Sequence, residues 1–154
     1  MLDIYIDGDA CPVKQEVERV AARHGLTAYL VSNGGLRPSA NPLFRAVVVS
    51  EGADAADDWI AEHIGERDLA ITADIPLAAR CLEKGARVLA PNGKPFTKDN
   101  IGIALGMREL HRHVRELERT ETFHAGFGKK DRSRFLEAME NEIQALRRAT
   151  AAQF

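Results

Sequence analysis

The chain has 154 residues and two cysteines that form no Cys-x-x-Cys pair, so it is long enough for one domain with a buried core and has neither a disulfide framework nor a zinc knuckle. It contains no run of about 18 apolar residues and no signal-peptide pattern, and we expect a cytoplasmic protein without a membrane segment. The formal net charge is −2, but residues 1–93 hold 14 acidic and 9 basic side chains and residues 94–154 hold 9 and 12, a division that suits a metal site beside an anion-binding surface.

The first predicted elements are a buried strand and the helix that follows it. Residues 4–6 are apolar and β-prone, and this run stops at Asp7 and Asp9. Pro12 suits the first turn of a helix because it has no N–H to lose, and apolar residues recur at helical spacing until Gly25. The two aspartates therefore lie at the carboxyl end of a strand, where open α/β sheets bind ligands. The alternative is that Asp9 only caps the helix and Asp7 is a loop residue.

Two further strands, at residues 27–33 and 46–50, precede an acidic helix. If this helix begins at Asp54, then Asp57 and Asp58 follow at i+3 and i+4, and up to three carboxylates face the same way from its first turn. Acidic residues in a first helical turn also interact favourably with the helix dipole. A purely structural role is therefore the alternative for these three residues.

The pattern of strand, aspartate, proline and helix then occurs a second time. A strand at residues 69–74 ends in Asp74, Pro76 opens a helix that ends at Gly85, and a fifth strand occupies residues 86–90. Alternating strands and helices predict a five-stranded, mainly parallel sheet with helices on both faces. In the strand order 3-2-1-4-5 the first and fourth strands are neighbours, which places Asp7 beside Asp74.

The C-terminal part, residues 94–154, is predicted to be a helical extension of the same single domain whose α/β core spans residues 1–93. Thr97 is placed as the N-cap of a helix that runs to about Thr120. A last amphipathic helix spans residues 131–150, after a loop, and its predicted buried residues are Phe135, Leu136, Met139, Ile143 and Leu146. The first of these helices carries a stripe of arginines that is either a solvated face or a nucleic-acid contact: Arg108, Arg112, Arg115 and Arg119.

The predicted cluster of carboxylates points to a hard divalent cation. Carboxylates that lie close together repel one another, and a cation removes that conflict. Oxygen ligands favour Mg²⁺ or Mn²⁺, whereas Zn²⁺ would need histidine or cysteine ligands, which are not grouped here. A cation of this kind beside a phosphate supports hydrolysis of a phosphodiester. The candidate metal ligands are Asp7, Asp9, Asp54, Asp57, Asp58 and Asp74.

Four stretches of the chain carry recognisable motifs. They are Asp-Gly-Asp-Ala-Cys-Pro-Val-Lys at residues 7–14, Gly-Ala-Asp-Ala-Ala-Asp at 52–57, Ile-Thr-Ala-Asp-Ile-Pro-Leu-Ala at 71–78 and Phe-Gly-Lys-Lys-Asp-Arg at 127–132. In sequence and position they resemble the motifs of the YaiI/YqxD family of bacterial proteins. The first motif of that family usually reads Asp-Ala-Asp, where this chain has Gly8 between its two acids.

The resemblance implies a fold and an activity. The family is grouped with PIN-like domains, which are three-layer sandwiches and metal-dependent ribonucleases with acids after the first strand, on a middle helix and after the fourth strand. Carried over to this chain, those catalytic positions are Asp7, Asp54 with Asp57 or Asp58, and Asp74. The expected activity is metal-dependent cleavage of single-stranded RNA. The expected substrate-binding residues are Lys14, Ser32, Asn33 and Arg37.

Two other functions remain open at this point. A strand that ends in Asp-x-Asp also resembles the haloacid dehalogenase phosphatases, with Asp7 as nucleophile, Asp9 as acid and Ser32 as the second-strand hydroxyl. Asp54 and Asp58 would then hold Mg²⁺, but the lysine that this mechanism needs is missing, since no lysine lies between Lys14 and Lys84. The other alternative is an RNA-binding module without catalysis.

Overall fold

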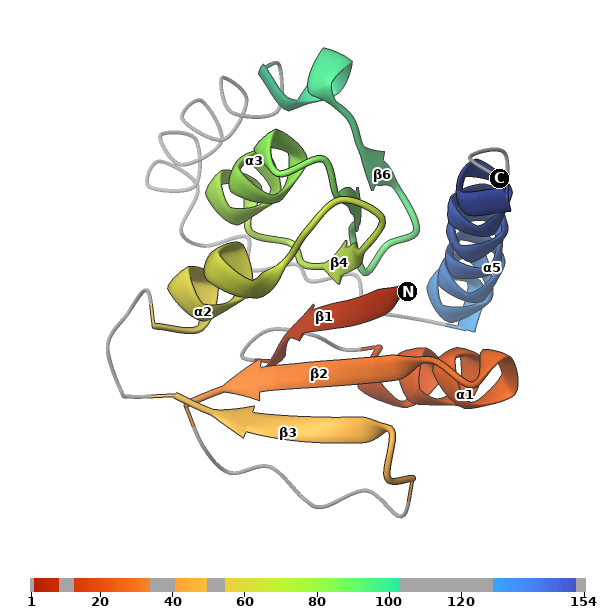
Figure 1. The fold of residues 1–154 in the computed structure, drawn as a ribbon. Coiled ribbons are helices and arrows are strands. Elements are labelled where there is room, and N and C mark those ends of the chain that lie inside the picture. Colours follow the sequence, from red (N-terminus) through yellow and green to blue (C-terminus); the bar gives the residue numbers. More distant parts are fainter. Residues whose placement is uncertain (1, 9–12, 34–40, 50–54, 103–128, 152–154) are drawn as a thin grey trace, which may run out of the picture.

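The computed structural model describes residues 2–8, 13–33, 41–49, 55–102 and 129–151, which form an open sheet with helices on both faces (Figure 1). Its strands are β1 (Asp3–Asp7), β2 (Thr27–Ser32), β3 (Phe44–Val48), β4 (Leu69–Ile71), β5 (Arg87–Leu89) and β6 (Pro95–Phe96). Its helices are α1 (Lys14–His24), α2 (Ala55–His63), α3 (Ile75–Glu83) and α5 (Lys129–Ala151). Across the described residues the strand order is β3-β2-β1-β4-β5-β6.

The five strands from β3 to β5 are parallel and confirm the predicted order. β1 lies between β2 and β4, and its apolar residues Ile4, Tyr5 and Ile6 are all buried. A central parallel strand has both faces covered, which explains why its sequence is a continuous apolar run rather than an alternating one. The strand that ends at Asp7 is therefore the neighbour of the strand that leads to Asp74.

The structure adds a sixth strand, β6, to the five that the sequence predicts. In a turn, the N–H of Ala90 donates to the carbonyl of Lys94 and the N–H of Gly93 donates to the carbonyl of Ala90, and Pro95 and Phe96 then pair antiparallel with β5. Gly93 has a φ of +88° in this turn, a conformation that favours glycine. Two residues are too few to show any periodicity, so the pairing depends on the turn rather than on a pattern in the strand.

Several strand boundaries differ from the predicted ones by one to three residues, among them the start of β3 and the end of β4. β3 begins at Phe44 rather than Ala46, because Ala28 of β2 is already paired with Phe44. β4 ends at Ile71 rather than Asp74, because the chain leaves the sheet there and turns into the cap of α3. Pairing with β2 sets the first limit and the cap of α3 sets the second, and a local apolar run encodes neither of them.

The ends of α1 and α3 follow from their sequences. Gly25 ends α1 with a φ of +67°, and its N–H points to the carbonyls of the last turn. Asp74 is the N-cap of α3, where its side chain accepts a hydrogen bond from the N–H of Leu77, and Pro76 lies in the first turn. The predicted apolar faces of both helices are buried.

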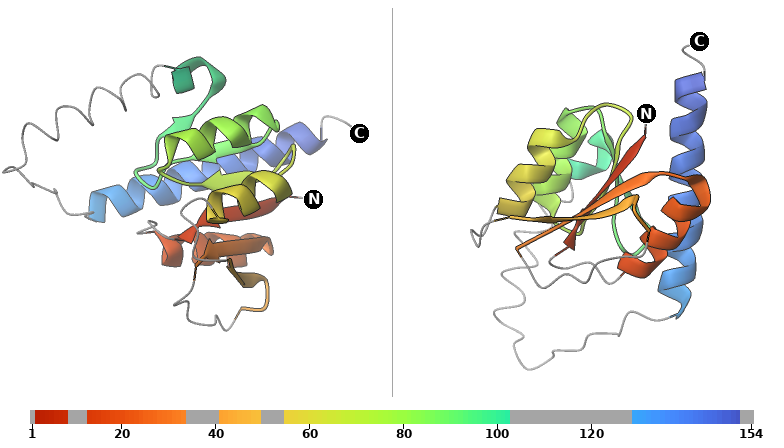
Figure 2. Two further views of the ribbon diagram at one scale, coloured as in Figure 1. Left: turned by 90° about the vertical axis from the view of Figure 1, so that its left-hand side faces the viewer. Right: turned by 60° about the horizontal axis from the view of Figure 1, so that its bottom comes forward.

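The molecule has three layers, as the sequence predicts. Alternate residues of a strand point to opposite faces, and Ile4 and Ile6 belong to one buried cluster with α1 and α5, whereas Tyr5 belongs to another with α2 and α3. In the right-hand view of Figure 2 the strands run between α2 and α3 on one side and α1 and α5 on the other. Asp7 follows Tyr5 by two residues and therefore continues its face, toward α2 and α3.

The last helix, α5, completes the core on the α1 side. Phe135, Met139 and Ile143 have no exposed surface, and Leu146 is also buried, as predicted. Leu136, which the sequence also places in the core, is only half-buried. α5 begins at Lys129, two residues before the predicted start.

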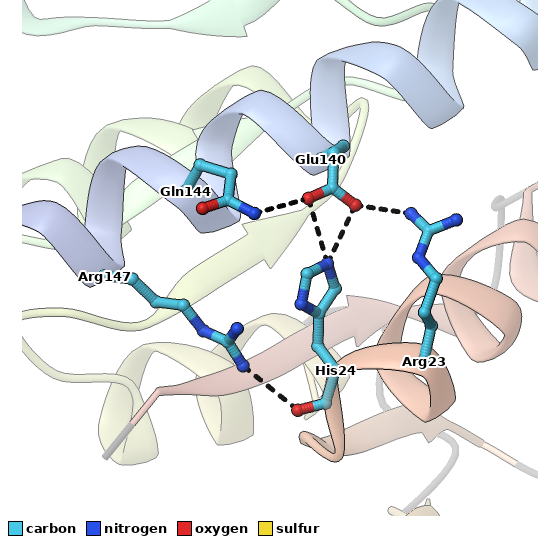
Figure 3. Close-up of polar contacts among 5 residues, drawn as sticks. All are labelled: Arg23, His24, Glu140, Gln144 and Arg147. Carbon is cyan, nitrogen blue, oxygen red and sulfur yellow. Dashed lines mark hydrogen bonds and ion pairs between the residues drawn. The ribbon is translucent and has the colours of Figure 1, made fainter.

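Polar side chains fasten α5 to the end of α1 (Figure 3). The Nε2 atom of His24 lies 2.8 and 3.0 Å from the two carboxylate oxygens of Glu140. Arg23 and Gln144 also bind this carboxylate, and Arg147 donates to the backbone carbonyl of His24. We call these five residues the α1–α5 clamp.

The segment after β6 is described only as far as residue 102. Thr97 accepts a hydrogen bond from the N–H of Asn100, and Asn100 accepts one from the N–H of Thr97, so the predicted cap is confirmed. Residues 98–102 are helical, and the rest of that predicted helix, with its four arginines, lies outside the described residues. No helix within the described ranges is long and apolar enough to cross a membrane.

Candidate functional site

The candidate site lies where β1 and β4 end. Ile6 of β1 pairs with Ile71 of β4, so the next residues, Asp7 and Thr72, are neighbours on the face that carries α2 and α3. The hydroxyl of Thr72 donates a hydrogen bond to Oδ2 of Asp7 over 3.1 Å. Thr72 is 1% exposed and Asp7 is half-buried, so the carboxylate of Asp7 is bound from the protein interior.

Thr72 also connects this pair to Asp74. The Oγ1 atom of Thr72 accepts a hydrogen bond from the backbone N–H of Asp74 over 3.0 Å. Oδ1 of Asp74 accepts from the N–H of Leu77 over 2.9 Å as the cap of α3. One buried hydroxyl therefore links the carboxylate of Asp7 to the residue that carries the second predicted acid.

The acids of α2 stand in its first turn, as predicted, but one of them is bound to α3. Asp57 is half-buried, and Asp58 is exposed. Oδ1 of Asp58 lies 2.9 Å from Nη1 of Arg80, in an ion pair between two exposed side chains that joins α2 to α3. A pair of this kind stabilises a fold by at most about 1 kcal/mol, so it is weak enough for another cation to compete with it.

The remaining predicted ligands, Asp9 and Asp54, lie outside the described residues. Within the described residues no three side chains of His, Cys, Asp or Glu stand close enough together to hold a metal ion. The structure thus links Asp7 with Asp74 through Thr72 and directs Asp58 toward Arg80.

The predicted substrate-binding residues occupy different environments. Lys14 is half-buried at the start of α1, and Asn33 is exposed just after β2. Ser32 is 3% exposed at the end of β2, and its backbone carbonyl accepts a hydrogen bond from Val49. Arg37 lies outside the described residues.

Two residues that contact the candidate ligands were not indicated by the sequence: Thr72 and Arg80. Thr72 does have a signal, because it directly follows β4 at the register position opposite Asp7, the last residue of β1. A hydroxyl at that position can reach the neighbouring carboxylate. Arg80 has no such signal, because its contact with Asp58 depends on how α2 and α3 lie against each other.

The surroundings of Gly8 show how closely the chain is packed directly after Asp7. A Cβ atom on this residue would lie 2.9 Å from the carbonyl oxygen of Val31 and 3.0 Å from a methyl carbon of Leu30. The first distance is shorter than real side chains show, and a backbone oxygen has little freedom to move. The end of β1 therefore lies tightly against β2 at the position where this chain departs from the usual Asp-Ala-Asp motif.

The motif at residues 127–132 has a contact beside α1. Nη1 of Arg132 lies 2.9 Å from Oε1 of Glu16, whose side chain is 10% exposed. The other oxygen, Oε2, is buried and has no hydrogen-bond partner among the residues that the structure describes. This ion pair joins the first turn of α1 to the first turn of α5, so both helices begin side by side.

Comparisons with known proteins agree with the motifs. Residues 5–145 match the sequence model of a family described as "Uncharacterized BCR, YaiI/YqxD family". A "UPF0178 protein" of Parvibaculum lavamentivorans is 56% identical over 148 residues, which cover 96% of this chain and 97% of the relative. UPF0178 proteins of Mesorhizobium japonicum and Ruegeria pomeroyi are each 55% identical, over 96% of this chain and 96% and 97% of their own lengths.

The comparison with solved structures gives no significant match. The family is nevertheless clear from sequence, because both the family model and the bacterial relatives extend over almost the whole chain. This chain belongs to the uncharacterised YaiI/YqxD family.

Proposed function

We propose that the protein is a divalent-metal-dependent nuclease that hydrolyses phosphodiester bonds of single-stranded RNA at the carboxyl edge of its sheet. The observation that supports this most directly is the buried hydroxyl of Thr72, which joins Asp7 to the backbone of Asp74. This link joins the end of β1, which carries Asp7, to the segment after β4, which carries Asp74. Both lie at the edge where parallel α/β sheets bind their ligands.

The direction of these hydrogen bonds is compatible with an ionised Asp7. The Thr72 oxygen accepts from the N–H of Asp74, and its hydroxyl donates to Asp7. Oδ2 of Asp7 is then an acceptor, which suits the ionised carboxylate that a metal ligand must be. Asp74 uses Oδ1 for the cap, and among the described residues its Oδ2 makes no hydrogen bond.

The donor set fits a hard cation. Asp7, Asp57 and Asp74 offer carboxylate oxygens, and the histidines of the described helices are engaged elsewhere: His24 with Glu140, and His63 with the carbonyl of Trp59. Mg²⁺ or Mn²⁺ would be held by Asp7 and Asp74, with Asp9 and the acids of α2, Asp54, Asp57 or Asp58, completing the set. When bound, the cation would polarise the phosphate and lower the pKa of a coordinated water.

The chain itself would orient the reactants. Thr72 fixes the rotation of Asp7, and the acids at the start of α2 would direct the attacking water toward the phosphorus. Lys14 and Asn33 lie near the amino end of α1 and the carboxyl end of β2, where they would contact the phosphate backbone. These contacts carry no information about base sequence, so we expect cleavage with little sequence preference.

The test is cleavage of a labelled single-stranded oligoribonucleotide in Mg²⁺ and in Mn²⁺. Asp7→Asn and Asp74→Asn should each abolish cleavage, whereas Glu83→Gln, which changes an exposed acid at the far end of α3, should leave it unchanged. Asn is the appropriate replacement at position 74 because its side-chain oxygen can still cap α3.

Two outcomes would favour the alternative functions. Release of phosphate from a monoester that depends on Asp7 but is indifferent to Asp74→Asn would indicate a phosphatase. If neither substrate is turned over and RNA binding does not respond to either substitution, the protein is a binding module and the nuclease proposal is wrong.

A further inference from the structure

A group of aromatic rings lies on the same face of the sheet as Asp7. The ring centres of Tyr5 in β1 and Tyr29 in β2 are 5.2 Å apart and stacked, and Trp59 of α2 lies 6.0 Å from both. His63, one turn further along α2, stacks on Trp59 with a centroid distance of 3.9 Å. We call Tyr29, Trp59 and His63 the aromatic surface, because Tyr5 beneath them is buried while these three reach solvent.

The aromatic surface is held in place from below. The hydroxyl of Tyr5 donates to the backbone carbonyl of His63 over 3.2 Å, and Nδ1 of His63 lies 2.7 Å from the carbonyl of Trp59. The hydroxyl of Tyr29 and the indole N–H of Trp59 make no hydrogen bond within the described residues, and neither atom is buried. Rings of this kind, with an apolar body fixed in the protein and a polar tip in water, are typical of binding surfaces.

A cation stands next to these rings. Arg45 of β3 is the register partner of Tyr29, and paired residues of parallel strands share a face. Its side chain is exposed, and Val47 beyond it is only half-buried, because α2 packs over β1 and β2 and leaves this part of β3 more open. The charge of Arg45 is also felt by Asp3: burial raises the pKa of Asp3, and the positive charges of the N-terminus and then of Arg45 oppose this rise.

The aromatic surface lies close to the candidate site. Asp7 pairs with Val31 of β2, and Tyr29 is two residues before Val31 on the same face. At roughly 3.3 Å per residue this corresponds to about 7 Å along the strand. A group stacked on Tyr29 would therefore be a near neighbour of a phosphate at Asp7.

We propose that the aromatic surface stacks against a base of a single-stranded RNA, with Arg45 at an adjacent phosphate. The choice of RNA as the occupant rests on the proposed function. The physical case is the combination of partly exposed aromatic rings (Tyr29 and Trp59 half-buried, His63 exposed) with an adjacent cation, which matches a base and its phosphate. Stacking accepts every base, so this contact gives affinity near the cleavage site without sequence preference.

Trp59 makes the contact directly observable, since it is the only tryptophan of the chain. Its fluorescence is followed while the intact protein is titrated with a single-stranded oligoribonucleotide in the presence of EDTA, so that no cleavage occurs. Inorganic polyphosphate, which has the charge but no bases, is the comparison probe. We expect saturable quenching by the oligonucleotide and none by polyphosphate.

Substitutions identify the surface. Tyr29→Leu should weaken binding by about 5- to 140-fold, the loss typical of one stacked base, and Tyr29→Phe should keep most of the affinity. Arg45→Gln should have a smaller effect and reduce the slope of log affinity against log salt by about 0.7. Phe96→Leu and Arg19→Gln are the controls, because Phe96 joins the same apolar cluster from β6 and Arg19 is an exposed cation of α1.

The results separate this proposal from the nuclease itself. If the oligonucleotide quenches Trp59 in EDTA and Tyr29→Leu weakens this binding, but the wild type cleaves no RNA in Mg²⁺ or Mn²⁺, the aromatic surface is supported and the nuclease proposal is wrong. Cleavage without quenching, or an affinity unchanged in a folded Tyr29→Leu protein, overturns the stacking proposal alone. Trp59 fluorescence that changes with protein concentration in the absence of RNA would instead assign this surface to a second copy of the chain.

Discussion

Thr72 provides the sharpest test of the site at the scale of single residues. Thr72→Val keeps the shape of the side chain but removes the buried hydroxyl that accepts from the N–H of Asp74 and donates to Asp7. We expect a loss of about 1–3 kcal/mol in the free energy of unfolding, measured by urea denaturation, and a loss of cleavage. Thr72→Ser keeps the hydroxyl and should retain most of both. Equal stability of the Val and Ser variants would contradict the structural role of this hydroxyl.

Asp74 has a structural role that can be separated from its proposed catalytic one. Asp74→Ala removes the cap of α3 and should cost about 1 kcal/mol of stability, whereas Asp74→Asn keeps a capping oxygen and should cost only a few tenths. Both variants lack the carboxylate, so both should lose metal-dependent cleavage. Thermal unfolding in EDTA measures the first effect. A large loss of stability in Asp74→Asn would mean that the charge itself serves the fold.

At the scale of whole elements, the α1–α5 clamp should make the free energy of unfolding depend on pH. The hydrogen bond from His24, followed in importance by that from Gln144, lowers the pKa of Glu140 from 4.5 to about 2. A carboxyl with a depressed pKa in the folded state stabilises the fold above its ordinary pKa, and this contribution is lost as the pH falls from 4.5 toward 2. Glu140→Gln should therefore reduce stability at neutral pH and flatten the decline of stability in acid.

The measurement is the free energy of unfolding, from urea denaturation at a series of pH values. Glu137→Gln is the matched control, because Glu137 is an exposed glutamate of the same helix. An acid decline that is the same in wild type and Glu140→Gln would show that the clamp contributes nothing to it.

Much of the arrangement of elements can be predicted because short sequence patterns determine where the helices and strands begin and end. Apolar spacing and Gly25 define α1, and the Asp74–Pro76 pair defines the start of α3. The parallel order then follows from general topology rules, which place the strand that ends at Asp7 beside the strand that precedes Asp74. β6 and the limits of β3 could not be predicted in this way, because pairing with another strand determines them.

The same distinction applies to the candidate site. The sequence places Asp7 and Asp74 at one edge, because that depends only on strand order. It does not show that Thr72 bridges them or that Asp58 faces Arg80, because these contacts depend on side-chain directions and on how two helices pack. The sequence also offers no sign that Tyr29 and Trp59 meet, since they are 30 positions apart in the chain and come together only when α2 crosses β2.

For the molecule as a whole, the proposed metal should act as a stabilising ligand. A cation that binds only the folded state raises its stability by about 2.7 kcal/mol at a free concentration 100 times its dissociation constant. We expect Mg²⁺ and Mn²⁺ to raise the unfolding temperature of the wild type, but not of Asp7→Asn, in a calorimetric titration. Glu83→Gln should respond as the wild type does. No shift at millimolar cation would contradict the metal site.

The position of α5 has a consequence for how the chain is made. Its buried Phe135, Met139 and Ile143 fill the core against β1 and α1, which lie far before α5 in the chain. During synthesis Ile4 and Ile6 therefore lack these partners until α5 has left the ribosome. Domains usually fold as units during or after synthesis, and this one needs α5 to complete its core. Until then the part of the sheet face that α5 covers is available to a chaperone.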